Sequence, residues 1–336
     1  MSYSFMKITV IFTGGTIGSI VGSDGYISPD RGQPYKLLKD CEGIEFHTRE
    51  TYRILSEHLD GEHLNLLADV VRQEMKDQEN AGIIITHGTD TLQYSAAVLS
   101  YLIGTDTIPV VLVSSDYPLE DERANGLVNF ACAVDFIQQG YGRGVFVSYC
   151  NKGQNPAIHR GTRLFAHQSY SADLYSIDQN FYGEYVNGQF VINERYSAGK
   201  TGYSRLGELG QKPEELCMNP ETRVLWIQPY VGITYPALKE NIGAVLLDSY
   251  HSGTIGIHRE LVDFLEEAQE KHIPVWLTGF PGEEHAYETI REYERLGIRV
   301  LPKMSAISAY CKLWLAAGNG MDIEKVMTSC IAEDFI

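Results

Sequence analysis

The chain has 336 residues, with 27 basic and 44 acidic side chains and a formal net charge of −17. A chain of this length exceeds most single hydrophobic cores, so we expect two domains. The acidic balance argues against nucleic acid or an anionic membrane surface as a partner.

The lack of targeting signals and the cysteine spacing indicate the cellular compartment of the protein. No stretch of the sequence is long and apolar enough to cross a bilayer, and residues 1–10 lack the basic start and apolar core of a secretory signal. The cysteines form no CxxC pair and have no metal-ligand spacing; they are Cys41, Cys132, Cys150, Cys217, Cys311 and Cys330. We therefore expect a cytoplasmic protein with reduced thiols and no bound metal.

Residues 7–19 (KITVIFTGGTIGS) join a short apolar run to a glycine turn. The run from Ile8 to Phe12 is typical of a strand buried on both faces. Gly14 permits a positive φ and a close approach of the backbone to a ligand. Because ligands bind at the carboxyl ends of parallel strands, Thr13 is expected in the site crevice. The alternative is an ordinary strand-to-helix turn, since the glycine spacing matches neither a dinucleotide fingerprint nor a P-loop.

Residues 21–35 combine glycines and prolines, so we expect a long loop without regular structure. Long loops in compact domains are usually lids or binding loops. Tyr26 carries a phenol that such a loop can swing into a site. The alternative is a tyrosine that packs the loop onto the surface.

Two further apolar runs end in polar residues. Residues 49–55 predict a strand that stops at Ser56. Residues 82–91 (GIIITHGTDT) repeat the strand-and-turn pattern, with Thr89 and Asp90 after the apolar run. Either residue is suited to cap the helix that follows, and capping is the simpler explanation of Asp90.

More strands and helices follow in alternation. Residues 108–115 and 144–150 predict buried strands, and helices are expected over 62–78 and 122–138. Alternation of apolar strands with amphipathic helices indicates a parallel doubly wound sheet with right-handed crossovers. Residues 159–198 are irregular and suit short hairpins.

A change in composition divides the chain. Residues 199–222 are rich in Gly, Pro and charge, which predicts an interdomain linker. A second strand-and-helix alternation begins at residue 223. The predicted fold class is therefore α/β. A larger N-terminal domain, residues 1–198, holds a doubly wound, mostly parallel sheet, and residues 223–336 form a smaller C-terminal α/β domain.

If the predicted strands share one sheet, the polar residues at their carboxyl ends converge on one crevice; they are Thr13, Ser56, Thr89, Asp90, Ser114 and Ser115. A threonine hydroxyl is a poor nucleophile at neutral pH and needs a base. Asp90 is too weak a base alone, but it can orient a stronger one or bind a substrate ammonium. Backbone N–H groups at a glycine turn and a helix N-terminus can serve as an oxyanion hole. The pattern indicates acyl transfer by a hydroxyl nucleophile, with no metal required.

Two motifs carry a resemblance to a known family. TGGTIG at 13–18 and HGTDT at 87–91 are similar to the two signatures of the bacterial L-asparaginases, particularly the cytoplasmic type I branch. The resemblance implies that Thr13 is the nucleophile that attacks the side-chain amide, and that Tyr26 is a lid tyrosine that assists it. Thr89 would be the second catalytic threonine.

The resemblance also implies substrate contacts. Asp90 would bind the substrate α-amino group, and Ser56 with Glu57 would hold the α-carboxylate and ammonium. Ser115 would contribute backbone near the side-chain amide. The glycines of the two motifs, Gly14 and Gly88, would line the substrate site. The family implies no cofactor and a homodimer or homotetramer.

The sequence departs from the family pattern at two places. The family pairs its second threonine with a lysine, and Ala166 occupies that position here; His58 replaces an aspartate that follows the binding serine. Three explanations remain open for the missing lysine. His167 is the base, Lys152 reaches in from an altered loop, or the protein binds without efficient turnover.

Three functions follow as hypotheses. The first is an amidohydrolase that converts L-asparagine to L-aspartate and ammonia through a threonine acyl-enzyme. The second is a catalytically weak or inactive sensor that binds an amino acid on the same scaffold. The third is the amidotransferase component that liberates ammonia for tRNA-dependent glutamine synthesis, which usually carries an extra N-terminal domain, whereas this chain begins at the first predicted strand.

Overall fold

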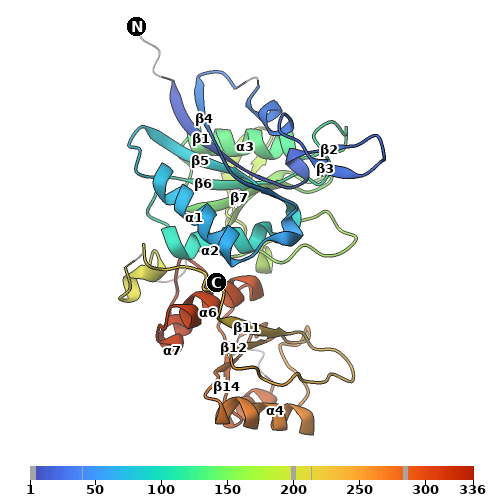
Figure 1. Cartoon of the computed structure of the whole chain (residues 1–336), viewed down its shortest axis with the longest axis vertical. Helices are drawn as coiled ribbons and strands as arrows, with labels where there is room; N and C mark the ends of the chain where they lie inside the picture. The colour runs from blue at the N-terminus through green and yellow to red at the C-terminus, as the bar shows by residue number, and fades with distance from the viewer. Residues whose placement is uncertain (1–4, 40, 198–201, 213, 283–286) are drawn as a thin grey trace. The chain divides into compact units, whose positions relative to one another are not determined.

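The computed structural model describes residues 5–39, 41–197, 202–212, 214–282 and 287–336, which fall into two compact units. Unit 1 is Met1–Ser197 and unit 2 is Ala198–Ile336 (Figure 1). The division lies next to the predicted end of the first domain. The described part of the segment predicted as a linker packs within unit 2, since Trp314 Nε1 donates to the Asn219 carbonyl at 2.9 Å.

Among its described residues, unit 1 is built on a sheet of eight strands in the order β10-β9-β8-β7-β6-β5-β1-β4. The parallel strands are β4 (Ile44–Ile54), β1 (Met6–Gly14), β5 (Asn80–Thr86), β6 (Val110–Val113) and β7 (Val145–Cys150). The antiparallel extension is β8 (Pro156–Arg160), β9 (Gly183–Val186) and β10 (Gln189–Ile192). The central strands are continuous apolar runs because helices cover both of their faces.

The helices of unit 1 lie on both faces of this sheet. Figure 1 shows α1 (Gly61–Glu74) and α2 (Leu92–Ile103) in front of the sheet and α3 (Gly126–Gln138) behind it. Alternate residues of the strands point to opposite faces. Val10, Ile84 and Val111 therefore pack with Phe130 and Phe136 of α3. The predicted doubly wound, mostly parallel sheet is confirmed.

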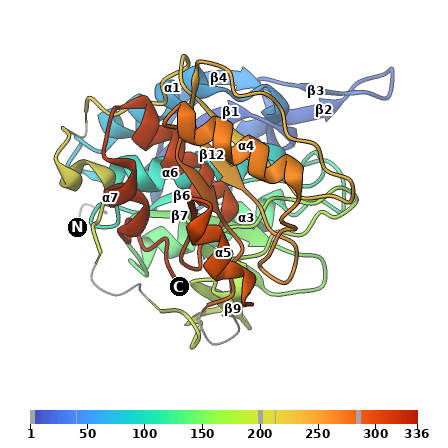
Figure 2. The ribbon, with the colours of Figure 1, turned by 90° about the horizontal axis from the view of Figure 1, so that it is seen from below.

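Residues 19–39 differ from the expected irregular loop. They form a hairpin of β2 (Ser19–Val21) and β3 (Ile27–Pro29), followed by the 3₁₀ helix η2 (Gln33–Leu38). The hairpin projects from unit 1 in both views (Figures 1 and 2). Gly22 and Gly25 lie in its turn, where the Gly22 N–H donates to the Tyr26 carbonyl at 2.8 Å. The prediction of no regular structure was wrong because these residues close a turn rather than interrupt a strand.

Among the described residues, unit 2 contains a parallel sheet of four strands, β11 (Arg223–Ile227), β12 (Ile242–Leu247), β13 (Val275–Leu277) and β14 (Ile298–Val300). The core side chains Val245 and Leu247 pack with Phe264 of α4 (Arg259–Glu270) and Tyr293 of α5 (Thr289–Arg295). Helix α6 (Ala306–Gly318) packs against β11 and β12, and α7 (Ile323–Thr328) packs against α6. The smaller C-terminal α/β unit is also confirmed.

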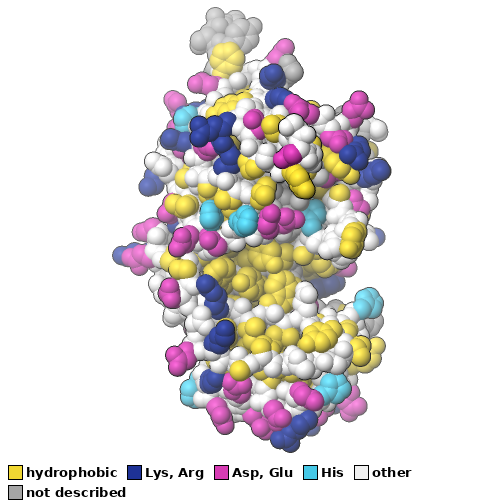
Figure 3. Space-filling view, turned by 45° about the vertical axis from the view of Figure 1, so that its right-hand side comes forward, with side chains coloured by type: hydrophobic (Ala, Val, Ile, Leu, Met, Phe, Trp, Pro, Cys, Tyr) yellow, Lys and Arg dark blue, Asp and Glu magenta, His cyan; other side chains and the backbone are white. Residues whose placement is uncertain are grey.

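The surface in Figure 3 carries acidic and basic side chains interspersed, without a patch of one sign on the face in view. Among the described helices, none has both the length and the apolar character needed to traverse a bilayer.

A buried ion pair in unit 2 gives the first prediction. The Lys312 ammonium donates to Asp334 Oδ2 at 2.7 Å and to the Ser329 carbonyl at 2.6 Å, and neither charged side chain is exposed. Replacing one partner of a buried pair costs about 3–5 kcal/mol, because the remaining charge loses its counter-ion. Asp334→Asn is therefore expected to lower the free energy of unfolding of unit 2 by that amount.

Urea unfolding followed by tryptophan fluorescence measures this change, since Trp226, Trp276 and Trp314 all lie in unit 2. Asp263→Asn is the control, because it removes a solvent-exposed ion pair with Arg259. An unfolding midpoint for Asp334→Asn equal to that of the control would contradict the prediction.

Candidate active site

The carboxyl ends of four neighbouring parallel strands form the candidate site. Strands β4, β1, β5 and β6 are adjacent and parallel, so their carboxyl ends lie on one edge of the sheet. Thr13 is the penultimate residue of β1, Ser56 follows β4, Thr89 follows β5, and Ser115 follows β6. These polar strand ends therefore share one edge of the sheet, whereas of them only Thr89 lines the cavity described below.

Glycines hold three of these turns against one another. Gly14 and Gly15 have φ angles of 103° and 77°. A Cβ atom on Gly15 would lie 2.4 Å from the Gly88 Cα, and a Cβ on Gly88 would lie 2.5 Å from the Ser56 Oγ. Carbon atoms of real side chains do not approach this closely. Only glycine therefore allows the β1, β4 and β5 turns to meet.

Thr13 is almost fully buried, with 2% of its surface exposed. Its hydroxyl donates to the Thr86 carbonyl at 2.7 Å. The neighbouring Tyr52 phenol has no hydrogen-bond partner of standard geometry among the described residues. Burial raises the pKa of Tyr52, and the interaction of its phenol with Thr13 opposes that rise. Tyr52 was not among the predicted site residues, because a tyrosine within a strand gives no signal of the hydroxyl it faces.

Asp90 and Ser56 are joined across the site. The Ser56 hydroxyl donates to Asp90 Oδ2 at 3.1 Å, and the Thr91 hydroxyl donates to the Ser56 carbonyl at 2.8 Å. The N-cap residue of α2 is Thr91, and no side-chain capping hydrogen bond is made there. Helix capping therefore does not account for Asp90. Glu57 lies in the 3₁₀ helix η3 (Ser56–His58) and is exposed.

His87 fixes the second glycine turn from inside. Its Nδ1 is 2.9 Å from the Gly88 carbonyl, and its Nε2 is 2.8 Å from the Ser95 Oγ of α2. Burial lowers the pKa of His87 to about 4, although the bond to Gly88 opposes this shift. The ring is therefore neutral near pH 7, with both nitrogens engaged. In the sequence this histidine stands out only as part of the second motif, and no role was predicted for it.

A cavity of about 640 Å³ opens beside Thr89 and Asp90. Asp116, Tyr149 and His167 contribute to its walls, and residues 168–172 complete them. Neither Ala166 nor Lys152 is among its lining residues, and both are exposed. The structure therefore brings His167, but not Lys152, to the cavity that contains the second threonine.

Two predicted site residues, Tyr26 and Ser115, differ from the others in exposure and in contacts. Tyr26 stands on the β2–β3 hairpin with 76% of its surface exposed. Ser115 is fully buried; its hydroxyl donates to the Tyr117 carbonyl at 2.5 Å and accepts from the Gly126 N–H at 3.1 Å. The Ser115 side chain is thus occupied at the start of α3, which leaves its backbone for a ligand.

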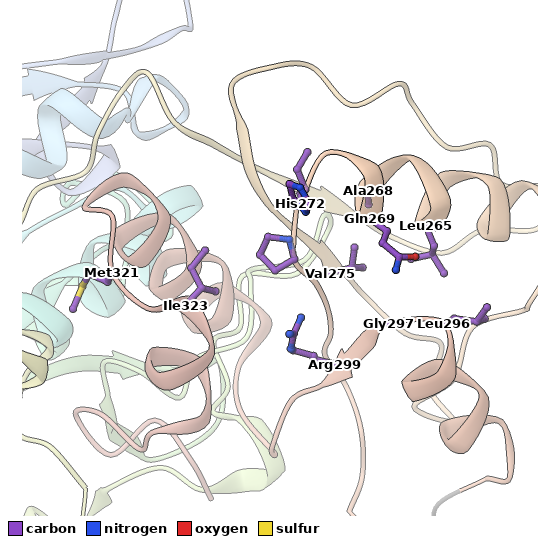
Figure 4. Close-up of a pocket in the computed structure, with 12 residues that line it drawn as sticks. Leu265, Ala268, Gln269, His272, Val275, Leu296, Gly297, Arg299, Met321 and Ile323 are labelled. Atoms are coloured by element: carbon purple, nitrogen blue, oxygen red, sulfur yellow. The ribbon is translucent and has the colours of Figure 1, made fainter.

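Unit 2 has a separate cavity of about 560 Å³, shown in Figure 4. His272, Val275 and Arg299 line it around the amino ends of β13 and β14. Ligands of open parallel sheets bind at the carboxyl ends of the strands, so this cavity lies at the wrong end for an active site. Among the described residues, no group of three or more His, Cys, Asp or Glu side chains is placed to hold a metal ion.

The chain is similar in sequence to known proteins. The family model described as asparaginase, N-terminal, matches residues 7–197, which is more than half of the chain. The chain is 27% identical over 334 residues to an L-asparaginase of Thermococcus kodakarensis, covering 96% of this chain and 95% of that protein. It is 28% identical over 354 residues to a glutamyl-tRNA(Gln) amidotransferase subunit of Methanobrevibacter smithii, covering 99% of this chain and 77% of that protein.

Solved structures give the same result for the fold. The thermostable L-asparaginase from Thermococcus kodakarensis has a TM-score of 0.78 at 25% identity, covering 98% of this chain and 99% of that one. L-asparaginase I from Vibrio cholerae has a TM-score of 0.72 at 21% identity, with 99% of each chain covered, which shows the fold alone. The relatives include both asparaginases and amidotransferase components, so they do not separate the two activities. The family-model match over more than half of its length shows that this chain belongs to the asparaginase family.

Proposed function

We propose that the protein hydrolyses the side-chain amide of L-asparagine to give L-aspartate and ammonia through an acyl-enzyme on Thr13. One observation carries the proposal. Ser56, Gly88 and Asp90 meet at the carboxyl edge of one parallel sheet, and Thr13 lies on the adjacent β1 end, next to the glycine turn that contacts Gly88. Hydroxyl groups, a carboxylate and close-packed backbone suit the recognition of an amino acid and attack on its amide.

The first chemical step is acylation. Thr13 Oγ1 attacks the amide carbon, the carbon–nitrogen bond breaks, and the hydroxyl proton ends on the nitrogen that leaves as ammonia. The Thr13 proton now points to the Thr86 carbonyl, so an oxygen lone pair is left for the attack. Backbone N–H groups at the start of α2 lack intrahelical partners and suit stabilisation of the oxyanion.

Substrate recognition is assigned to groups around the two turns. The Asp90 carboxylate pairs with the substrate ammonium, and Ser56, which already binds that carboxylate, contacts the substrate carboxylate. Glu57 stands beside Ser56 and takes part in ammonium binding. Gly14 and Gly88 keep the floor of the site open, and the Ser115 backbone lies near the side-chain amide.

Tyr26 is proposed as a residue of a closing lid. Its exposed position on the β2–β3 hairpin is that of an open lid, and closure would bring the phenol toward Thr13. We further propose that the protein is a cytoplasmic enzyme of the type I branch, needs no cofactor, and assembles as a homodimer or homotetramer.

A second candidate is the ammonia-releasing component of a tRNA-dependent amidotransferase. The 28% identity to the amidotransferase protein of Methanobrevibacter smithii over 99% of this chain favours it. Free asparagine separates the two: an asparaginase hydrolyses it unaided, whereas a channelling component needs its partner for efficient release. A third outcome, binding of asparagine without ammonia release, would identify the amino-acid sensor.

The central test is ammonia release from L-asparagine by the wild-type protein and by Thr13→Ala. We expect release by the wild type and a loss of about 10³-fold or more in the variant, because the nucleophile is removed. Thr13→Ser is the control, since it keeps a hydroxyl at the same place. Thermal unfolding checks that both variants fold. Undiminished turnover by Thr13→Ala would overturn the proposal.

The contact between the glycine turns gives a further prediction. Gly88 has an ordinary φ of −81°, so Gly88→Ala strains no backbone but drives a Cβ atom into Ser56. Displacing a reacting group by about 1 Å can cost about 10²-fold in rate, and we expect kcat/KM for asparagine to fall by this order.

Gly32→Ala is the matched control, because Gly32 also has a negative φ and its nearest neighbour is the carboxylate of Asp30. Steady-state kinetics measures kcat/KM for asparagine in both variants. Equal kcat/KM values for the two would show that the Gly88 contact with Ser56 does not hold the site.

A further inference from the structure

His167 lines the cavity of the second threonine and carries a buried ring nitrogen that no described residue binds. His167, Thr89 and Asp90 line the same cavity. The Nε2 atom of His167 is buried and has no hydrogen-bond partner among the described residues. A buried polar atom without a partner costs about 1–3 kcal/mol, so such an atom beside a reactive group calls for a functional explanation.

The ring of His167 is held in one orientation. It packs edge-on against Tyr149, with the ring centroids 5.5 Å apart and an interplanar angle of 60°. It also makes a hydrogen bond to the backbone of Asp173, which favours the protonated ring. Because Nε2 is unpartnered, we assign that bond and the ring proton to Nδ1. The neutral ring thus offers its Nε2 lone pair, as a general base requires.

The surroundings keep this imidazole neutral near pH 7. Burial is the largest effect and lowers the pKa of His167, while Asp90 and Asp173 act in the opposite direction. His159 lies close enough for mutual repulsion of the two protonated rings. The other titratable residues of the cavity wall are Asp116, Tyr117, Tyr149 and Tyr170.

Other candidate bases around the site are engaged or placed elsewhere. Both nitrogens of His87 have partners, at Gly88 and Ser95. His159 Nδ1 is 2.8 Å from the Ser176 Oγ, and its ring lines a different cavity. Of the described residues that line the Thr89 cavity, His167 alone carries an imidazole and none carries an amine or guanidinium.

We propose that His167 is the general base for Thr89 in the hydrolysis of the acyl-enzyme. This inference rests on the proposed function and adds the group that moves the proton. Water gives a proton to Thr89 Oγ1, and the Thr89 hydroxyl proton passes to His167 Nε2. The water oxygen bonds to the acyl carbon and the bond from that carbon to Thr13 Oγ1 breaks. The proton on His167 then returns through Thr89 to the Thr13 oxygen, which restores all three side chains.

The test compares His167→Gln with His159→Gln. The control removes a neighbouring buried histidine of the same kind from the other cavity. For His167→Gln we expect kcat for asparagine to fall about 10²–10⁴-fold. KM falls with it and kcat/KM stays nearly unchanged, because only deacylation is slowed. Acylation continues, so ammonia appears in a burst of about one per active site before turnover slows, and intact-protein mass spectrometry detects the acyl group.

The pH profile separates a base from a residue that only supports the fold. In the wild type, kcat is expected to fall as the pH drops through the His167 pKa, which lies below the ordinary value of 6.5 because of burial. His167→Gln lacks that acidic limb. In His167→Ala, added imidazole is expected to restore part of the turnover, which a purely structural role would not allow.

Two failures are distinguishable. If wild-type protein releases no ammonia from asparagine, the proposed function fails and the role of His167 falls with it. If the wild type is active but His167→Gln retains its kcat within threefold and keeps the acidic limb, the function stands and the inference about His167 is overturned.

Discussion

The candidate site depends on the contact between the backbones of the β1 and β5 turns. Gly15 and Gly88 approach so closely that a single Cβ atom on Gly15 would overlap the other turn. Gly88 in turn leaves room for Ser56 from the β4 turn. Three loops from adjacent parallel strands thereby share one small volume. The hydrogen bond between Ser56 and Asp90 is made across this close packing.

Burial controls the protonation of the site. His87 and His167 both have pKa values lowered by desolvation, so both rings are neutral near pH 7, but their roles differ because of their partners. His87 uses both nitrogens to hold the turn. His167 lines the cavity of Thr89, and its Nε2 has no hydrogen-bond partner among the described residues. The same physical effect therefore yields one supporting imidazole and one imidazole available for proton transfer.

The proposed role of His167 is compatible with the alanine at position 166. That position is exposed, and the cavity wall is formed by the next residue, His167. A base needs only a lone pair within reach of the hydroxyl and a pKa suited to the working pH. An imidazole oriented by Tyr149 and the Asp173 backbone meets the second condition without a lysine.

The sequence by itself determined the doubly wound sheet and the polar strand ends at Thr13, Ser56, Thr89 and Asp90, because apolar periodicity and glycine turns are local signals. It did not determine the hairpin at Tyr26, since glycines that close a turn and glycines that interrupt a strand look alike in sequence. Tertiary structure alone decided that Tyr52 faces Thr13 and that His167 enters the Thr89 cavity. Such contacts join residues far apart in the chain, and only the packed sheet sets their distances.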